Sequence, residues 1–106
     1  MIINATGNEN YNAIEIRAYR SRNYGETEYW VSVVPVMVDG WCVRSICFDG
    51  YKQTLATAKR ASKKAEFEAM VRAMDYVPRM IYKVCKENDL TITQDYDLSA
   101  IVFKVN

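Results

Sequence analysis

The residues best suited to bind a ligand form a short basic run near the middle of the chain. Four cations fall within six positions: Lys59, Arg60, Lys63 and Lys64. Like charges four residues apart repel on a helix face, and cations near a helix start oppose its dipole. Two local rules are broken together, which is typical of functional sites. We expect these side chains to contact phosphates or an acidic protein surface; the alternative is a solvated face balanced by Glu66 and Glu68.

A second basic cluster lies nearer the start of the chain, at Arg17, Arg20 and Arg22. Alternation predicts that Arg17 and Tyr19 share the polar face of a strand, with Arg20 toward its end. Arginine beside tyrosine on an open sheet face stacks bases or holds phosphates. The alternative is a solvated face paired with the nearby glutamates: Glu15, Glu26 and Glu28.

The run Ala61-Ser62-Lys63-Lys64-Ala65, after a predicted hairpin and at the start of an Ala-rich helix, resembles the end of the double-stranded-RNA-binding domain. In that family a Ser-Lys-Lys stretch at the helix start grips phosphates across the groove. The resemblance covers about residues 29–74 and implies this role for Lys63 and Lys64. It also implies that RNA is recognised by its shape. The chain differs from the family in beginning with a predicted strand rather than a helix.

Groups for catalysis and metal binding are scarce. The chain has no histidine, which removes the commonest general acid–base and a frequent zinc ligand. The cysteines have no CxxC spacing, and we expect three reduced, buried thiols: Cys42, Cys47 and Cys85. The acidic stretch 87–97 lacks the glycine and final glutamate of a calcium loop. We therefore expect a protein that is not an enzyme and that uses no metal or cofactor.

Length and composition predict a single globular domain over residues 1–106. Half of the residues are apolar and a quarter are charged, and the net charge is +1. This near-neutral balance excludes binding of polyanions by bulk charge, so local patches must act. There is no leader-like start and no apolar run of about 20 residues. We expect a cytoplasmic protein without membrane contact.

Alternating and β-branched residues predict a sheet. The predicted strands are 13–20, 28–38, 41–48 and a closing strand at 98–105, placed beside the first. Asp39-Gly40 predicts a hairpin between the second and third. Pro35 marks the second as an edge or a bulge, and an exposed edge would favour a homodimer. Residues 1–11 are either a loose arm or a lead-in to the sheet, and 90–93 predict a short strand.

Residues 54–86 are rich in helix formers and predict a helix with Thr54 or Thr57 as its N-cap. Two stripes follow helical spacing: a small one at Leu55, Ala58, Ser62, Ala65 and Ala69, and a bulky one at Phe67, Val71, Met74, Val77, Ile81 and Val84. Pro78 predicts that one helix ends near Tyr76 and that a second runs from Pro78 to Lys86, with a single kinked helix as the alternative. The fold class is therefore α+β: an antiparallel sheet of three N-terminal strands plus a C-terminal strand, packed against a long helix broken or kinked near Pro78.

Two functions of different classes fit these features. The first is a module that contacts nucleic acid, or a protein of a nucleic-acid-handling complex. It would use Lys59, Arg60, Lys63 and Lys64, with Arg17 and Arg20. The second is a small inhibitor or adaptor that acts by protein–protein contact. In its size and lack of catalytic groups the chain is similar to phage anti-defence proteins, including anti-CRISPR proteins.

Overall fold

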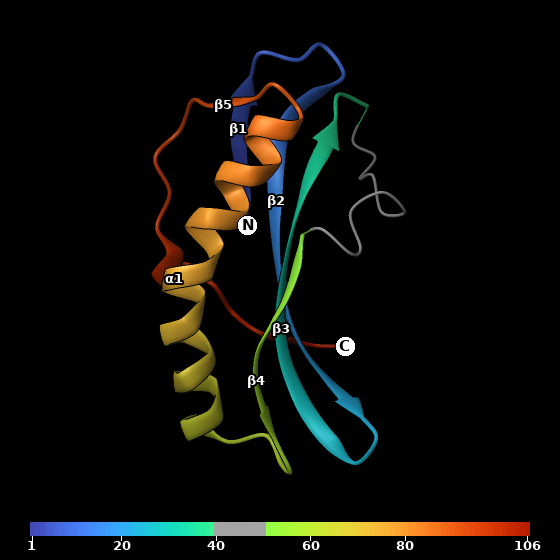
Figure 1. The fold of residues 1–106 in the computed structure, drawn as a ribbon, viewed down its shortest axis with the longest axis vertical. Coiled ribbons are helices and arrows are strands. Elements are labelled where there is room, and N and C mark those ends of the chain that lie inside the picture. The colour runs from blue at the N-terminus through green and yellow to red at the C-terminus, as the bar shows by residue number, and fades with distance from the viewer. Residues whose placement is uncertain (40–50) are drawn as a thin grey trace.

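The computed structural model describes residues 1–39 and 51–106, which form a curled sheet covered on one face by a helix (Figure 1). The strands are β1 (Ile2–Thr6), β2 (Tyr11–Asn23), β3 (Glu26–Met37), β4 (Lys52–Ala58), β5 (Thr91–Ile92) and β6 (Lys104–Val105). Their order is β4-β3-β2-β1-β5, and β6 also pairs with β2. Helix α1 (Lys63–Glu87) packs against β3 and β4. The predicted α+β class, with the helix on one face of an antiparallel sheet, is confirmed.

The hairpin of β2 and β3 is the longest element pair of the sheet. Its two-residue turn, Tyr24-Gly25, has φ angles of 50° and 78°, as the favoured turns of tight hairpins require. The strands run in continuous register from Ile14↔Pro35 to Asn23↔Glu26. Both predicted strands are therefore present, and each reaches closer to the turn than alternation alone indicated.

Residues 52–58 form strand β4, so the prediction of a helix from Thr54 is wrong. β4 pairs antiparallel with β3, with Thr54 opposite Trp30 and a register shift at Tyr29/Trp30. Leu55 is fully buried in this strand. The edge of β3 needs a partner, and pairing with it outweighs the helix propensity of this alanine-containing stretch. Neither threonine caps a helix, and Leu55 and Ala58 belong to no helical stripe.

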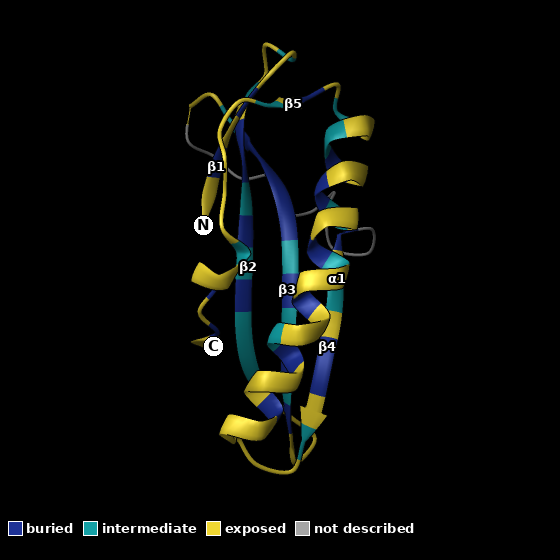
Figure 2. Cartoon of the chain, turned by 90° about the vertical axis from the view of Figure 1, so that its left-hand side faces the viewer, coloured by how far each residue is buried: buried dark blue, intermediate teal, exposed yellow. Residues whose placement is uncertain are grey.

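Helix α1 begins at Ser62, whose Oγ accepts a hydrogen bond from the Ala65 N–H at 3.1 Å. Its buried face changes from small to bulky along the chain, as the dark stripe on α1 in Figure 2 shows: Ala65, Ala69, Ala73, Val77, Ile81 and Val84. Alanine at the start lets the helix lie close to the sheet. The predicted bulky stripe is half wrong, because Phe67, Val71 and Met74 are exposed.

The helix is one element through Pro78, so the expected division into two helices near Pro78 is wrong. A kink at Pro78 stays a prediction. At the other end of α1, Asn88 closes the helix with its backbone N–H on the Val84 carbonyl oxygen at 3.1 Å. Among the described residues no helix is long and apolar enough to cross a membrane.

The two ends of the chain complete the sheet. The first residues form β1, a lead-in to the sheet rather than a loose arm, and β5 pairs with β1 at Thr6↔Thr91. The predicted closing strand is mostly wrong: Leu98–Ala100 is a 3-10 helix, and only Lys104–Val105 pair, parallel to β2. Their place beside the first predicted strand is as expected. The 3-10 helix takes up the start of this segment. The Phe103 ring packs edge-on against the Tyr29 ring, with the ring centres 5.5 Å apart, so few residues are left to pair.

Two strand predictions concern the region around residues 35–50. The Asp39-Gly40 hairpin and the strand 41–48 lie outside the described residues. As a whole β3 lies inside the sheet, because it pairs with β2 along its length and with β4 from Thr27 to Ser32. Around Pro35 its described strand partner is β2, and an edge at that point stays a prediction. One register shift lies at Tyr29/Trp30, and a second lies between Tyr11 and Ala13, opposite Met37 and Val36 and next to Pro35. A homodimer through a strand edge stays a prediction.

Candidate functional site

The cations predicted to act together are gathered at one end of the elongated molecule. The end of β4 and the start of α1 meet there, beside the β2–β3 turn, at the bottom of Figure 1. Lys63 and Lys64 are the first two residues of α1, and Lys59 and Arg60 lie on the bend before it. We call these four residues the basic end. The repulsion expected along a single helix face does not arise, because the four do not share a helix.

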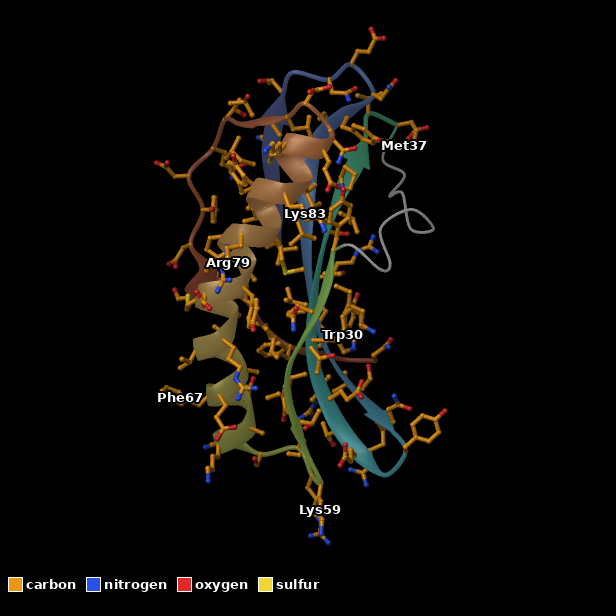
Figure 3. All side chains as sticks on the ribbon, in the orientation of Figure 1. Trp30, Met37, Lys59, Phe67, Arg79 and Lys83 are labelled. Atoms are coloured by element: carbon orange, nitrogen blue, oxygen red, sulfur yellow. The ribbon has the colours of Figure 1, made fainter. Side chains whose placement is uncertain are left out.

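Polar contacts from the sheet hold the segment that carries the basic end. The Arg22 guanidinium donates to the Lys59 carbonyl oxygen at 2.5 Å and to Thr27 Oγ1 at 3.2 Å. The Ser62 N–H donates to the Tyr29 hydroxyl oxygen at 3.3 Å. The backbone is therefore anchored while the four cationic side chains are exposed; Lys59 extends from the end of the molecule in Figure 3.

The start of α1 adds backbone donors to this cluster. Ser62 Oγ accepts a hydrogen bond from the Ala65 N–H, and the Ser62 carbonyl oxygen accepts one from the Glu66 N–H. The N–H groups at the very start of a helix have no intrahelical acceptor, and the helix dipole is positive there. Lys63 and Lys64 occupy these first positions. Side-chain and backbone charge therefore favour an anion at the same place.

The glutamates that follow do not neutralise the basic end. Glu66 and Glu68 lie in the first turns of α1 and are exposed. Among the described residues the ion pairs within 4.0 Å are Arg17–Glu15 and Arg79–Asp75, and neither includes a residue of the basic end. The predicted alternative, a face balanced by Glu66 and Glu68, has no direct contact to support it.

The second predicted cluster is divided by the sheet. Arg17 lies on the face away from α1 and pairs with Glu15, while Arg20 shares the strand face of buried Ile16 and Ala18. Arg17 and Arg20 therefore lie on opposite faces of the sheet, as side chains three apart on a strand do, and a role for either in binding stays a prediction. Arg22, which was not among the favoured residues, joins the basic end instead through its contact with Lys59.

A groove of about 690 Å³ follows the face of the sheet away from α1. In it the rings of Tyr19 and Trp30 lie 4.9 Å apart at 33°, and Lys52 Nζ lies 4.5 Å from the Trp30 ring centre. We call this the open-face groove. Tyr29 and Trp30 are adjacent in β3, so one of them must face away from the core, but only the strand register brings Trp30 opposite Tyr19. Lys52 was missed because its strand was predicted to be loop and helix.

The outer face of α1 carries apolar side chains at helical spacing. Phe67 is 70% exposed, Tyr82 is 68% exposed, and Val71 and Met74 lie between them on the exposed side. We call these four residues the outer stripe. Exposed apolar side chains gathered on one face of a small protein often mark an interaction site.

The titratable groups outside the basic end and the open-face groove make contacts that belong to the fold. Burial raises the pKa of the Cys85 thiol, which keeps it protonated and weakly nucleophilic at neutral pH. Hydrogen bonds from Ser99 lower the pKa of Asp97, which caps the 3-10 helix. In the acidic stretch, Glu87 accepts a hydrogen bond from the Tyr51 hydroxyl. Within residues 1–39 and 51–106 no three side chains converge to form a metal site.

Comparison of the chain with family models, curated proteins and solved structures gave no match. The resemblance to the double-stranded-RNA-binding domain therefore rests on the Ser62-Lys63-Lys64 run and its place in the chain. In the structure that run stands at the first turn of a helix that follows a strand of the sheet.

Proposed function

We propose that the protein is a non-enzymatic binding module that contacts nucleic acid through the basic end. The observation that carries this proposal is the group of four exposed cations around the start of α1, with no ion-pair partner among the described residues. Phosphate groups suit such a cluster, because ammonium and guanidinium groups and helix N–H donors all bind them.

The distribution of charge supports a contact at this end rather than over the whole surface. The net charge is only +1, so the molecule has no general attraction for polyanions. The other end of the molecule, around the end of α1 and the β1–β2 turn, carries acidic residues: Glu9, Glu87 and Asp89. Lys83 and Lys86 lie near these acids, so the far end has mixed charge, and a phosphate backbone would bind preferentially at the basic end.

The position of Ser62-Lys63-Lys64 supports the same proposal. The run opens a helix directly after a strand, which is where the similar run of the double-stranded-RNA-binding domain stands. By this resemblance Lys63 and Lys64 contact phosphates across a groove, and duplex RNA is preferred to duplex DNA through its shape. Contacts of this kind carry no sequence preference.

The proposal predicts a steep dependence of binding on salt. Four phosphate contacts release four counterions, so log K against log salt should have a slope of about −3 to −4 on a duplex. Fluorescence anisotropy with labelled RNA and DNA duplexes of about 16 base pairs, the length that shape-reading domains span, measures the slope. Absence of binding at low salt, or a slope near zero, would sink the proposal.

A second candidate function is favoured by the outer stripe: an adaptor or inhibitor that binds another protein. Exposed Phe67 and Tyr82 are residue types that anchor protein interfaces. This contact lies on the outer face of α1, whereas the basic end lies at its start. The phage anti-defence proteins named above act through contacts of this general class.

This second candidate predicts that Phe67→Gln with Tyr82→Gln abolishes capture of a specific protein from a host lysate. Glutamine keeps the helix propensity while removing the apolar contact. The control is Lys63→Ala with Lys64→Ala, which should leave capture unchanged. If the outer-stripe variant captures the same protein as the parent, the stripe is not the docking surface.

A further inference from the structure

The face of the sheet away from α1 presents two aromatic rings between cationic side chains. Tyr19 and Trp30 stand opposite each other on β2 and β3. On the far side of Tyr19, Lys104 of β6 is its register partner. On the far side of Trp30, Lys52 of β4 lies over the ring at 4.5 Å. No described helix covers these side chains, and both rings are only half-buried.

Hydrogen bonds fix the larger ring in place. The Trp30 indole N–H donates to Ser21 Oγ at 3.0 Å, and Asn106 Nδ2 donates to the same oxygen at 3.1 Å. The indole therefore cannot rotate freely, and its face is held toward the groove. The groove volume of about 690 Å³ lies within the range of sites that hold small ligands or parts of larger ones.

The open-face groove and the basic end are linked through the end of β2. Ser21, Arg22 and Asn23 of β2 line one end of the groove. The Arg22 guanidinium lies on the α1 side of the sheet, where it binds Thr27 Oγ1 and the Lys59 carbonyl oxygen. Within the groove Arg17 is paired with Glu15, and Lys52 lies over the Trp30 ring. A strand whose phosphates bind the basic end therefore approaches the aromatic rings past the end of β2 and meets the Lys52 cation there.

We infer that the open-face groove holds an unpaired base of the nucleic acid, stacked on the Trp30 ring in the place of the Lys52 ammonium group. This inference rests on the proposed function and specifies its ligand as single-stranded at this point. Stacking of a base on an aromatic ring is stronger than a cation–π contact at an exposed site, so the exchange is favourable. The displaced Lys52 then pairs with the adjacent phosphate.

Replacement of the Lys52 ammonium group by a stacked base also limits which ligands can bind. A base inside a duplex is already stacked and presents no face to a tryptophan, whereas a single strand or a loop offers one. Every base has a π face, so the binding tolerates any sequence. The ligand is therefore a single strand, or a duplex with an unpaired segment that reaches the groove from the basic end.

Tryptophan fluorescence tests the inference on the full chain. The chain has two tryptophans, so Trp41→Phe makes Trp30 the only emitter. Titration with oligothymidylate or oligouridylate is expected to quench Trp30, and a blunt duplex of the same length is expected to leave it unquenched. In the same background, Lys52→Gln should keep the quenching while lowering the salt slope by about one.

A second variant tests affinity. Trp30→Leu is expected to weaken single-strand binding by roughly tenfold, the loss typical of one base–aromatic stack, and to leave duplex binding unchanged. Tyr96→Leu is the matched control, since it removes an exposed aromatic ring that belongs to none of these surfaces and should change neither. Circular dichroism establishes that Trp30→Leu is folded. The quenching measurements and the Lys52→Gln variant keep Trp30, so their results do not depend on the folding of Trp30→Leu.

The outcomes separate this inference from the proposed function. Equal quenching by single strand and duplex, or unchanged single-strand affinity in folded Trp30→Leu, would overturn the inference and leave binding at the basic end intact. Quenching by single strands that survives loss of Lys63 and Lys64 would support the groove and contradict the basic end. Failure of both ligands to bind at low salt would overturn both.

Discussion

Replacing Lys59, Arg60, Lys63 and Lys64 together by alanine is expected to remove most of the salt-dependent binding of nucleic acid. With four phosphate contacts, the parent should bind roughly a hundredfold more weakly at about 200 mM salt than at about 50 mM. The variant should lose about one unit of slope for each contact removed, and so become nearly independent of salt. Anisotropy titrations at several salt concentrations give both slopes. All four side chains are exposed, so the variant should fold.

Two double variants separate the effect of where the lysines lie from the effect of the net charge on binding. Lys63→Ala with Lys64→Ala and Lys83→Ala with Lys86→Ala each remove two lysines, from opposite ends of α1. The first should lower the salt slope by about two, whereas the second should leave it almost unchanged. Equal losses in the two variants would show that overall charge governs binding, and that the basic end is not the site.

Gly7→Ala is expected to destabilise the protein strongly, and far more than the same change at Gly25. Gly7 has a φ of +115°, and a Cβ at this position would lie 2.5 Å from the carbonyl oxygen of Asp89. The strained backbone and the clash together should cost about 2–4 kcal/mol of unfolding free energy. Urea or thermal unfolding measures this loss, which corresponds to a fall of roughly 10–20 °C in Tm.

Gly25→Ala is the matched control for this prediction. Gly25 also has a positive φ, of +78°, but no atom lies within 4 Å of the position of its Cβ. Its cost should be about 1 kcal/mol, from the backbone conformation alone. If the two variants lose the same stability, close packing of the β1–β2 turn on the end of α1 contributes little. The contact from Asn8 Nδ2 to the Asn88 carbonyl oxygen, at 2.8 Å, lies at this junction.

Local sequence patterns were enough to predict the parts of the fold in which a pattern is compatible with only one kind of element. Strict alternation around Ile14 and Ile16 predicts a half-buried strand, and β2 is that strand. The alanines from Ala65 onward predict a helix that lies close to a sheet, and they form the buried face of α1. The basic end was also predicted, because its residues are neighbours in the chain.

Partners distant in the chain decided the rest. Residues 54–58 were predicted to be helical, and pairing with β3 makes residues 52–58 a strand instead. Because these residues belong to the sheet, the helix starts later, with Ser62 as its cap. The Ser62 hydroxyl accepts a hydrogen bond from the third N–H of the helix. The side chain of Phe67 is exposed for a related reason: the alanine stripe, not the bulky one, fits against the sheet.

The sequence by itself determined the α+β class, the two long strands, the helix with its small-residue face, and a cluster of four cations. These depend on neighbours within a few residues, where spacing and propensity act directly. Only the tertiary structure decided that Arg22 supports the basic end and that Trp30 stands beside Tyr19 under Lys52. The physical reason is strand register, because a shift of one residue sends every side chain of a strand to the other face, and register is set by pairing between residues far apart in the chain.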